Sequence, residues 1–218
     1  MFAALLFLAP PPVLLAIKAP IGAKYVMDLT FKMKGVGGGG WLEVQTTITE
    51  TLSKKEGKND WWAMKFDVTK TLGEGELKGA GKGMEDLENY KMSFLRNSQN
   101  QIVKAKVNGT DVGGEAFKST SDVTFSAKPV NVGSTWTGTL DLGGKPVKTT
   151  YRFEGAKAWN GKAAFLVTAT FSDAAIVMVK PYRFYVEKGS CKTLYAEGAA
   201  RVTTAGKSLD VSFQMKRR

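Results

Sequence analysis

The chain has 218 residues, of which 43% are hydrophobic, so it is long enough for one domain and apolar enough for a packed core. Its formal net charge of +11 comes from 31 lysines and arginines, spread along the sequence, against 20 acidic residues, and it favours anionic partners. The absence of histidine, together with a single cysteine, Cys191, excludes histidine-based nucleophilic triads, histidine and thiolate metal sites and intramolecular disulfide bonds.

The N-terminal residues 2–16, FAALLFLAPPPVLLA, form an uncharged apolar run. The run is short for a membrane-spanning helix, and three consecutive prolines interrupt it, so it is more typical of a secretory signal peptide. The lack of disulfide bonds fits a bacterial envelope protein better than a small eukaryotic secreted one. We therefore expect a secreted or periplasmic protein.

Small residues allow signal cleavage after Ala16, Ala19 or Ala23. We predict cleavage after Ala23, because a clear strand pattern begins at the next residue. This divides the chain into a signal peptide, residues 1–23, and a single domain, residues 24–218. The alternative is that residues 1–23 remain as an uncleaved anchor.

Ten segments of this domain alternate apolar and polar side chains, which is the period of two of a strand with one buried face. They are residues 25–34, 42–49, 62–68, 90–94, 103–107, 151–153, 165–171, 182–186, 194–202 and 209–215. Glycine-based turns separate them, and we expect helix only in short stretches within residues 113–126 and 174–180. The pattern predicts a mainly β fold, an antiparallel curved sheet forming a half-barrel or barrel of about ten strands with little helix.

The glycine-rich stretch KGVGGGGW, residues 34–41, invites comparison with a phosphate-binding loop. Such a loop needs a helix directly after it, so that backbone N–H groups and the helix dipole meet the anion. Here Trp41 begins a strand pattern instead. We interpret the stretch as a flexible hairpin loop.

Methionine and phenylalanine gather on the strand faces that the alternation predicts to be buried. Their soft, adaptable side chains suit a cavity for lipid or another apolar ligand. The candidate ligand-binding residues are Phe31, Trp62, Met64, Phe66, Met92, Phe94, Phe165 and Phe171. The same residues would equally make an ordinary core, and both interpretations stay open.

Tryptophans offer a second interpretation, because exposed indole rings stack on sugars. The chain has five of them: Trp41, Trp61, Trp62, Trp136 and Trp159. Trp61 and Trp62 are adjacent, so in a strand they point to opposite faces and one of them should be in the core.

Carboxylate pairs, such as Glu74 with Glu76, lie in predicted loops, where solvent-exposed charge is their simplest interpretation. Carboxylate-only calcium or magnesium sites stay open in principle. Without histidine, Cys191 is not expected to be catalytic. We predict a protein that is not an enzyme, with no catalytic residue, no metal site and no cofactor.

Residues 128–136, KPVNVGSTW, are followed by YRFEGAKAWNGKAAFLVTATF at 151–171 and by FYVEKGSCKTLYAEGAARV at 184–202. This order of turn and strand motifs resembles uncharacterised secreted bacterial β-rich proteins, which are themselves similar to the half-barrels of periplasmic lipoprotein carriers. The resemblance extends over residues 24–218 and implies a curved antiparallel half-barrel. Its motifs are structural and imply no catalytic residue.

Taken together, these features predict an exported non-enzymatic protein that binds an apolar or amphipathic ligand, such as lipid, on a curved β-sheet. The alternative is an envelope structural or polysaccharide-binding module that uses exposed tryptophans. An anionic envelope surface is a further expected partner, and nucleic acid is not. The sequence does not specify the oligomeric state.

Overall fold

The computed structural model of the protein describes residues 11–112, 123–141, 146–204 and 206–218. Within these ranges it has twelve strands, one short α-helix and two 3-10 helices. In chain order these are β1 (Lys24–Gly35), β2 (Trp41–Glu56), β3 (Asn59–Glu74), η1 (Gly75–Leu77), α1 (Lys78–Glu85), η2 (Asp86–Asn89), β4 (Met92–Arg96), β5 (Ile102–Val107), β6 (Thr110–Asp111), β7 (Thr135–Asp141), β8 (Pro146–Ala156), β9 (Ala164–Phe171), β10 (Ile176–Glu187), β11 (Thr193–Thr204) and β12 (Lys207–Arg217).

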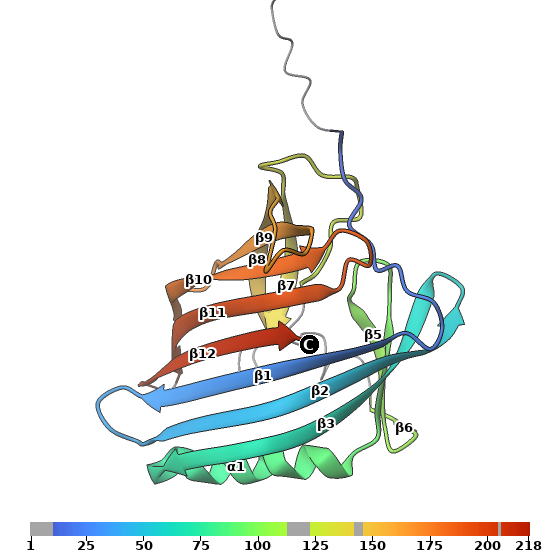
Figure 1. Cartoon of the computed structure of the whole chain (residues 1–218). Helices are drawn as coiled ribbons and strands as arrows, with labels where there is room; N and C mark the ends of the chain where they lie inside the picture. The colour runs from blue at the N-terminus through green and yellow to red at the C-terminus, as the bar shows by residue number, and fades with distance from the viewer. Residues whose placement is uncertain (1–10, 113–122, 142–145, 205) are drawn as a thin grey trace, which may run out of the picture.

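All twelve strands belong to one antiparallel sheet in the order β6-β5-β4-β3-β2-β1-β12-β11-β10-β9-β8-β7. Strands β1–β6 and strands β7–β12 are each a meander in which consecutive strands pair, and the first and last strands join the two halves at the centre. Figure 1 shows the sheet curling, so that both ends turn away from the plane of the central strands. The predicted antiparallel curved sheet is confirmed, and the sheet is open at the edge strands β6 and β7.

The strand count exceeds the expected ten because the sequence pattern missed two edge strands. One is β6, which has only two residues. The other is β7, TWTGTLD, where threonine and glycine stand in place of a run of large apolar side chains. Edge strands are commonly short or weakly apolar, so alternation marks them poorly.

Of the two stretches expected to hold a helix, the one within residues 174–180 is wrong, and most of the one within residues 113–126 is not described. Residues 176–180 belong to strand β10, and residues 123–126 lie in neither helix nor strand, while residues 113–122 are outside the described part of the chain. The helical turns instead occupy residues 75–89, whose glycines were interpreted as turns. The helix forms because it packs against β2 and β3: a Cβ atom at Gly81 would lie 2.6 Å from Thr71 Cγ2 and 2.9 Å from Leu42 Cδ1.

The alternation of side chains gives the sheet an inner, concave face and an outer face. Residues paired across the strands share a face, as Val44, Phe31, Phe213 and Gly198 do on β2, β1, β12 and β11. The main hydrophobic core lies on this inner face, where Met27, Ile48 and Met215 are buried.

The described part of the connection between the two halves, from residue 123 onward, also lies on the inner side of the sheet. Because β6 and β7 are opposite edges, the chain between them crosses from one edge to the other. In its described part, Val123, Phe125 and Val130 are buried in the main core. Phe125 N donates to Gln99 O in the loop after β4, so this connection fills part of the concave face.

Residues 13–23, here called the N-terminal strap, pack against the domain. Val13 and Val130 exchange two backbone hydrogen bonds of 2.8 Å, and Leu52 N donates to Ala23 O at 2.9 Å. Leu15 is 1% exposed within the main core, and Ala19 packs against buried Leu52 and Trp62. The strap therefore contributes to the core, although it falls inside the predicted signal peptide. Among the described residues, no helix has the length and apolar character to span a membrane.

Candidate ligand-binding face

Six apolar side chains of the two central strands form an inner-face patch that the rest of the protein covers only in part. We call this set the apolar strip: Leu29, Phe31 and Met33 of β1, with Leu209, Val211 and Phe213 of β12. Phe31 lies opposite Phe213, and Met33 lies opposite Val211. All six are half-buried. Such a contiguous, partly accessible apolar patch inside a curved sheet suits an apolar ligand.

The strip is more exposed than the inner-face residues of the neighbouring strand β2. Leu42 and Val44, which pair with Met33 and Phe31, are 1% and 0% exposed. The difference has a local cause, because α1 packs against β2 and β3 and places Gly81 close to the Leu42 side chain. The helix therefore covers the inner face of β2 and leaves the strip on β1 and β12 partly open.

Tyr182 of β10 borders the strip. Its ring lies on the backbone of Gly198, where an added Cβ would be 2.5 Å from the ring. The ring centroid is 5.1 Å from that of Phe213 and 4.7 Å from that of Phe171. Tyr182 is 1% exposed, and its hydroxyl has no hydrogen-bond partner in the part of the chain that the structure describes. Burial raises the pKa of Tyr182 to about 12.

The structure divides the eight predicted ligand-binding residues into two groups. Trp62, Met64, Met92 and Phe94 are buried by the protein's own atoms, while Phe31, Phe66, Phe165 and Phe171 are half-buried. Six of the eight belong to the main core or pack against it, and Trp62 belongs to a smaller cluster with Ala19 and Leu52. Of the eight, only Phe31 lies in the strip.

The sequence prediction named none of the strip residues of β12. The signal was present, because residues 209–215 alternate in the same way as residues 25–34. Alternation does not show which strands pair. The pairing of the first strand with the last brings Phe213 and Val211 beside Phe31 and Met33.

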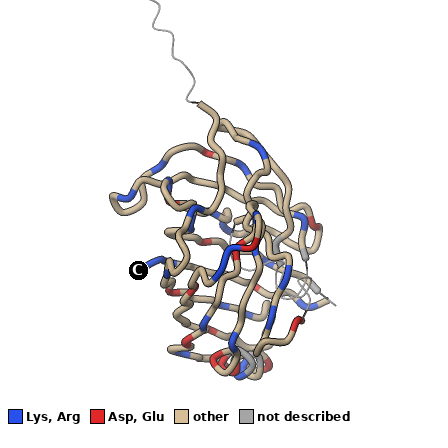
Figure 2. The backbone as a smooth tube through the Cα atoms, turned by 90° about the vertical axis from the view of Figure 1, so that its right-hand side faces the viewer, with Lys and Arg blue, Asp and Glu red and all other residues tan. Residues whose placement is uncertain are grey.

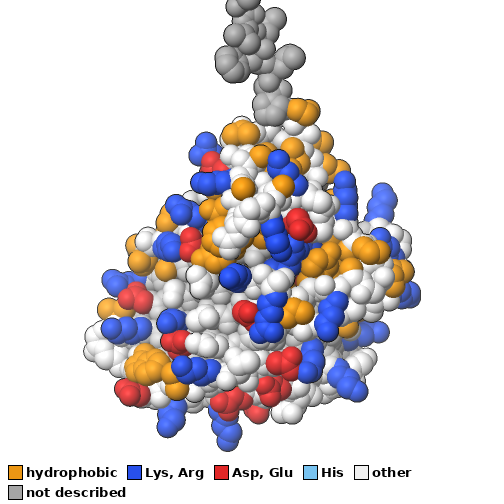
Figure 3. Space-filling model, viewed as in Figure 1, with side chains coloured by type: hydrophobic (Ala, Val, Ile, Leu, Met, Phe, Trp, Pro, Cys, Tyr) orange, Lys and Arg blue, Asp and Glu red, His pale blue; other side chains and the backbone are white. Residues whose placement is uncertain are grey.

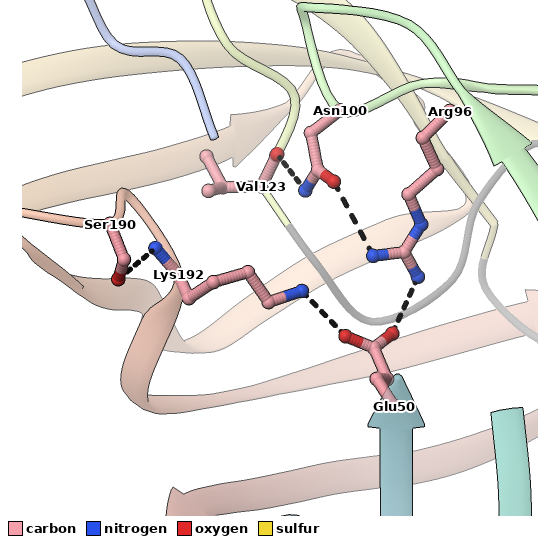
Figure 4. A network of polar contacts seen from close by, with 6 residues as sticks. All are labelled: Glu50, Arg96, Asn100, Val123, Ser190 and Lys192. Carbon is pink, nitrogen blue, oxygen red and sulfur yellow. Dashed lines mark hydrogen bonds and ion pairs between the residues drawn. The ribbon is translucent and has the colours of Figure 1, made fainter. Parts of the chain in front are cut away.

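A buried ionic network lies elsewhere in the protein interior (Figure 4). Glu50 of β2 accepts from Arg96 Nη2 at 2.7 Å and from the ammonium of Lys192. The three side chains are 3%, 2% and 1% exposed. Burial alone would raise the pKa of Glu50, but the Arg96 and Lys192 charges outweigh it and lower the pKa to about 2.

Further contacts extend the network to other parts of the chain. Asn100 Nδ2 donates to Val123 O at 3.0 Å, and Lys192 N donates to Ser190 Oγ at 3.2 Å. The Lys192 ammonium also lies 4.6 Å from the centroid of the Trp62 ring. Arg96 Nη1 donates to Asn100 Oδ1 at 3.4 Å, so the network joins β2, β4 and the residue before β11 to the connection between the halves. Sequence reasoning missed it, although Glu50 continues the inner-face series of even-numbered residues on β2.

The outer face of the central strands is mixed in character (Figure 3). A groove of about 450 Å³ crosses it, where small residues lie between longer ones. Ala199 and Ser212 are among the small ones, and Trp41, Val179 and Lys34 are among those that border it. Trp61 is half-buried, and its indole N–H donates to Glu56 at 2.9 Å, while Trp62 is 0% exposed. This confirms that one of the adjacent tryptophans is in the core.

The remaining reactive groups have structural surroundings. Cys191 is 4% exposed, and burial raises the pKa of its thiol. Glu76 is exposed and forms an ion pair of 2.9 Å with Lys207. Within the described ranges, no three acidic or cysteine side chains group as metal ligands would.

No protein-family model and no curated protein matches the chain. Among solved structures, a DUF1329 family protein from Desulfovibrio piger is 11% identical, with 90% of this chain and 84% of that chain covered and a TM-score of 0.32. A protein from Vibrio parahaemolyticus named for outer membrane lipoprotein sorting is 9% identical, with 89% and 85% covered and a TM-score of 0.26. A β-barrel-like DUF1849 protein from Brucella abortus is 11% identical, with 93% and 100% covered and a TM-score of 0.26. At these identities and TM-scores the likeness carries no function to this chain.

Proposed function

We propose that this protein is an exported, non-enzymatic binding protein that holds an apolar or amphipathic ligand, such as a lipid, on the concave face of its sheet. The observation that carries the proposal is the apolar strip, six adjacent side chains left half-buried inside a curved sheet. The residues that would bind are those of the strip, with Phe171 at its border through Tyr182.

The energetic basis is the removal of the strip from water. Burial of apolar surface contributes about 25 cal/mol per Å², so covering even 200 Å² of protein and ligand surface would contribute about 5 kcal/mol before the entropic cost of binding. The other predicted residues, among them Trp62, Met64, Met92 and Phe94, are then the rigid core behind the site.

Export is supported by the uncharged apolar run at residues 2–16, and a periplasmic or secreted location follows from it. The basic residues are spread over the whole described backbone rather than gathered in one patch (Figure 2). The net positive charge favours attraction to an anionic envelope surface. We do not propose nucleic acid as a partner.

The proposal is tested with a matched pair of variants on neighbouring positions of β12. Val211→Asp places a charge in the strip, whereas Ser212→Asp places it on the outer face. We expect native mass spectrometry after organic extraction, and titration with a fluorescent fatty acid, to show ligand bound to the wild type and to Ser212→Asp but not to Val211→Asp. Val211→Thr, which nearly preserves the shape, should weaken binding and guards against a folding defect. A wild type that neither carries nor takes up ligand would refute the proposal.

The outer groove favours a second candidate function, binding of an envelope polysaccharide. Trp41 borders it beside Lys34, Asp210 and Ser212, which is the combination of an indole ring and hydrogen-bonding groups that binds sugars. Trp41→Ala should then abolish binding on a glycan array, and Trp61→Ala, outside the groove, should not. Equal binding by both variants would remove this candidate.

A further inference from the structure

We infer that the ligand of the apolar strip carries a hydrogen-bond acceptor on its alkyl chain, a carboxylate or carbonyl oxygen, and that the Tyr182 hydroxyl donates to this oxygen. The inference rests on the proposed function and names the chemical class of its ligand.

The first support is that the Tyr182 hydroxyl is a buried donor with no acceptor among the described residues. Buried tyrosine hydroxyls usually have a partner, because leaving a polar group dry and unpaired is unfavourable. Tyr195 of the adjacent strand follows this rule, since its hydroxyl donates to Glu197 at 2.9 Å and accepts from Gln214 Nε2 at 2.7 Å. The exception at Tyr182 therefore calls for a partner that the described residues do not supply.

The second support is the place of the ring. Its Cγ, Cδ1 and Cδ2 atoms lie over Gly198, between 2.5 and 2.8 Å from where a Cβ would be. Only glycine leaves room for this arrangement. The ring therefore lies over β11, with its centroid 4.7 Å from that of Phe171 and 5.1 Å from that of Phe213.

The third support is the neighbour that the ring meets there. Phe213 pairs with Gly198 on one side and with Phe31 on the other, so the Tyr182 ring contacts a member of the strip. A ligand chain that lies along Phe31 and Phe213 would therefore lie beside the Tyr182 ring.

The hydroxyl is suited to donate and not to ionise. With its pKa raised to about 12, it keeps its proton at any physiological pH. A hydroxyl in such dry surroundings binds an anionic or strongly polar oxygen best. Fatty acids and acyl esters present such an oxygen, and purely hydrocarbon chains do not.

The test uses Tyr182→Phe in the full chain, with calorimetric titration of two probes of equal chain length. Dodecanoate has an acceptor, and dodecyltrimethylammonium has none. We expect Tyr182→Phe to weaken dodecanoate binding at least five-fold and to leave the affinity for dodecyltrimethylammonium unchanged. Equal affinity of wild type and Tyr182→Phe for dodecanoate would overturn the inference. If Val211→Asp still abolished binding in that case, the proposed function would stand; if the wild type bound neither probe, both would fall.

Thermal unfolding without ligand gives an independent readout. Tyr182→Phe removes an unpaired hydroxyl, so we expect its Tm to equal or exceed that of the wild type. Tyr195→Phe is the matched control and should lower Tm, because it removes two hydrogen bonds. A loss of stability in Tyr182→Phe as large as that in Tyr195→Phe would show that the hydroxyl has a partner in the free protein, and would refute the inference.

Discussion

At the scale of single residues, the inner face combines two opposite environments. The apolar strip is partly open, while Glu50 is a carboxylate that is 3% exposed and held by two cations. Burying ions is unfavourable unless every charge is matched by close partners. Glu50 meets this condition, because it binds Arg96 and Lys192 through different carboxylate oxygens (Figure 4). The carboxylate thereby joins segments that are far apart in the sequence.

We predict that Glu50→Gln destabilises the protein by about 3–5 kcal/mol, because it leaves the buried Arg96 and Lys192 charges without their shared carboxylate. Urea denaturation followed by tryptophan fluorescence measures the change. Glu76→Gln, which breaks an exposed ion pair with Lys207, is the control and should be silent. Equal stability of the two variants would mean that the network contributes nothing.

The same carboxylate predicts a pH dependence. Its pKa is lowered from 4.5 to about 2 on folding, so the unfolded chain binds its proton more readily. The stabilisation is therefore complete above about pH 4.5 and is lost as the pH falls toward 2. We expect the free energy of unfolding of the wild type to decrease over this range more steeply than that of Glu50→Gln. Parallel pH profiles would contradict the assignment.

At the scale of elements, α1 decides which part of the concave face is open. The helix has little propensity of its own, since three of its eight residues are glycine, so packing against β2 and β3 must support it. Gly81 lies at this contact, next to Leu42 and Thr71, whereas Gly79 has nothing within 4 Å of its would-be Cβ.

This contrast predicts opposite effects of the same substitution two residues apart. Gly81→Ala should destabilise the protein by about 1–3 kcal/mol, because the methyl group would overlap Thr71 and Leu42. Gly79→Ala should be neutral or stabilising by up to about 1 kcal/mol, because alanine favours the helix. Thermal unfolding of both variants decides the matter, and destabilisation by Gly79→Ala would argue against the helix at this position.

At the scale of the whole molecule, the sequence was enough to predict the sheet but not the content of its concave face. Strands with one solvent-exposed face show a clear alternation of apolar and polar residues, so β1, β2, β11, β12 and the second half of β10 could be located from sequence. The pairing of β1 with β12 is a contact between the two ends of the chain, and no local pattern encodes it. A buried methionine such as Met64 and a half-buried one such as Met33 also look the same in sequence, because covering depends on α1 and on the connection at residues 123–130.

The N-terminal strap supplies part of the core that signal cleavage would remove. The expected cleavage after Ala23 would remove Leu15 and Ala19 from their hydrophobic clusters and would leave Leu52 and Trp62 without the strap. It would also remove the hydrogen bonds of Val13 with Val130 and of Leu52 with Ala23. Cleavage after Ala23 is therefore expected to lower the stability of the domain.

We predict that a chain beginning at Lys24 is less stable than the full chain by at least about 3 kcal/mol, since loss of one fully buried leucine side chain alone costs about 2–5 kcal/mol. A chain beginning at Pro11 keeps the whole strap and is the matched control. Urea denaturation of the three proteins gives the comparison, and N-terminal sequencing of the exported protein shows which form the cell produces. If the chain beginning at Lys24 were as stable as the control, the strap would be dispensable, and cleavage after Ala23 would then cost the fold nothing.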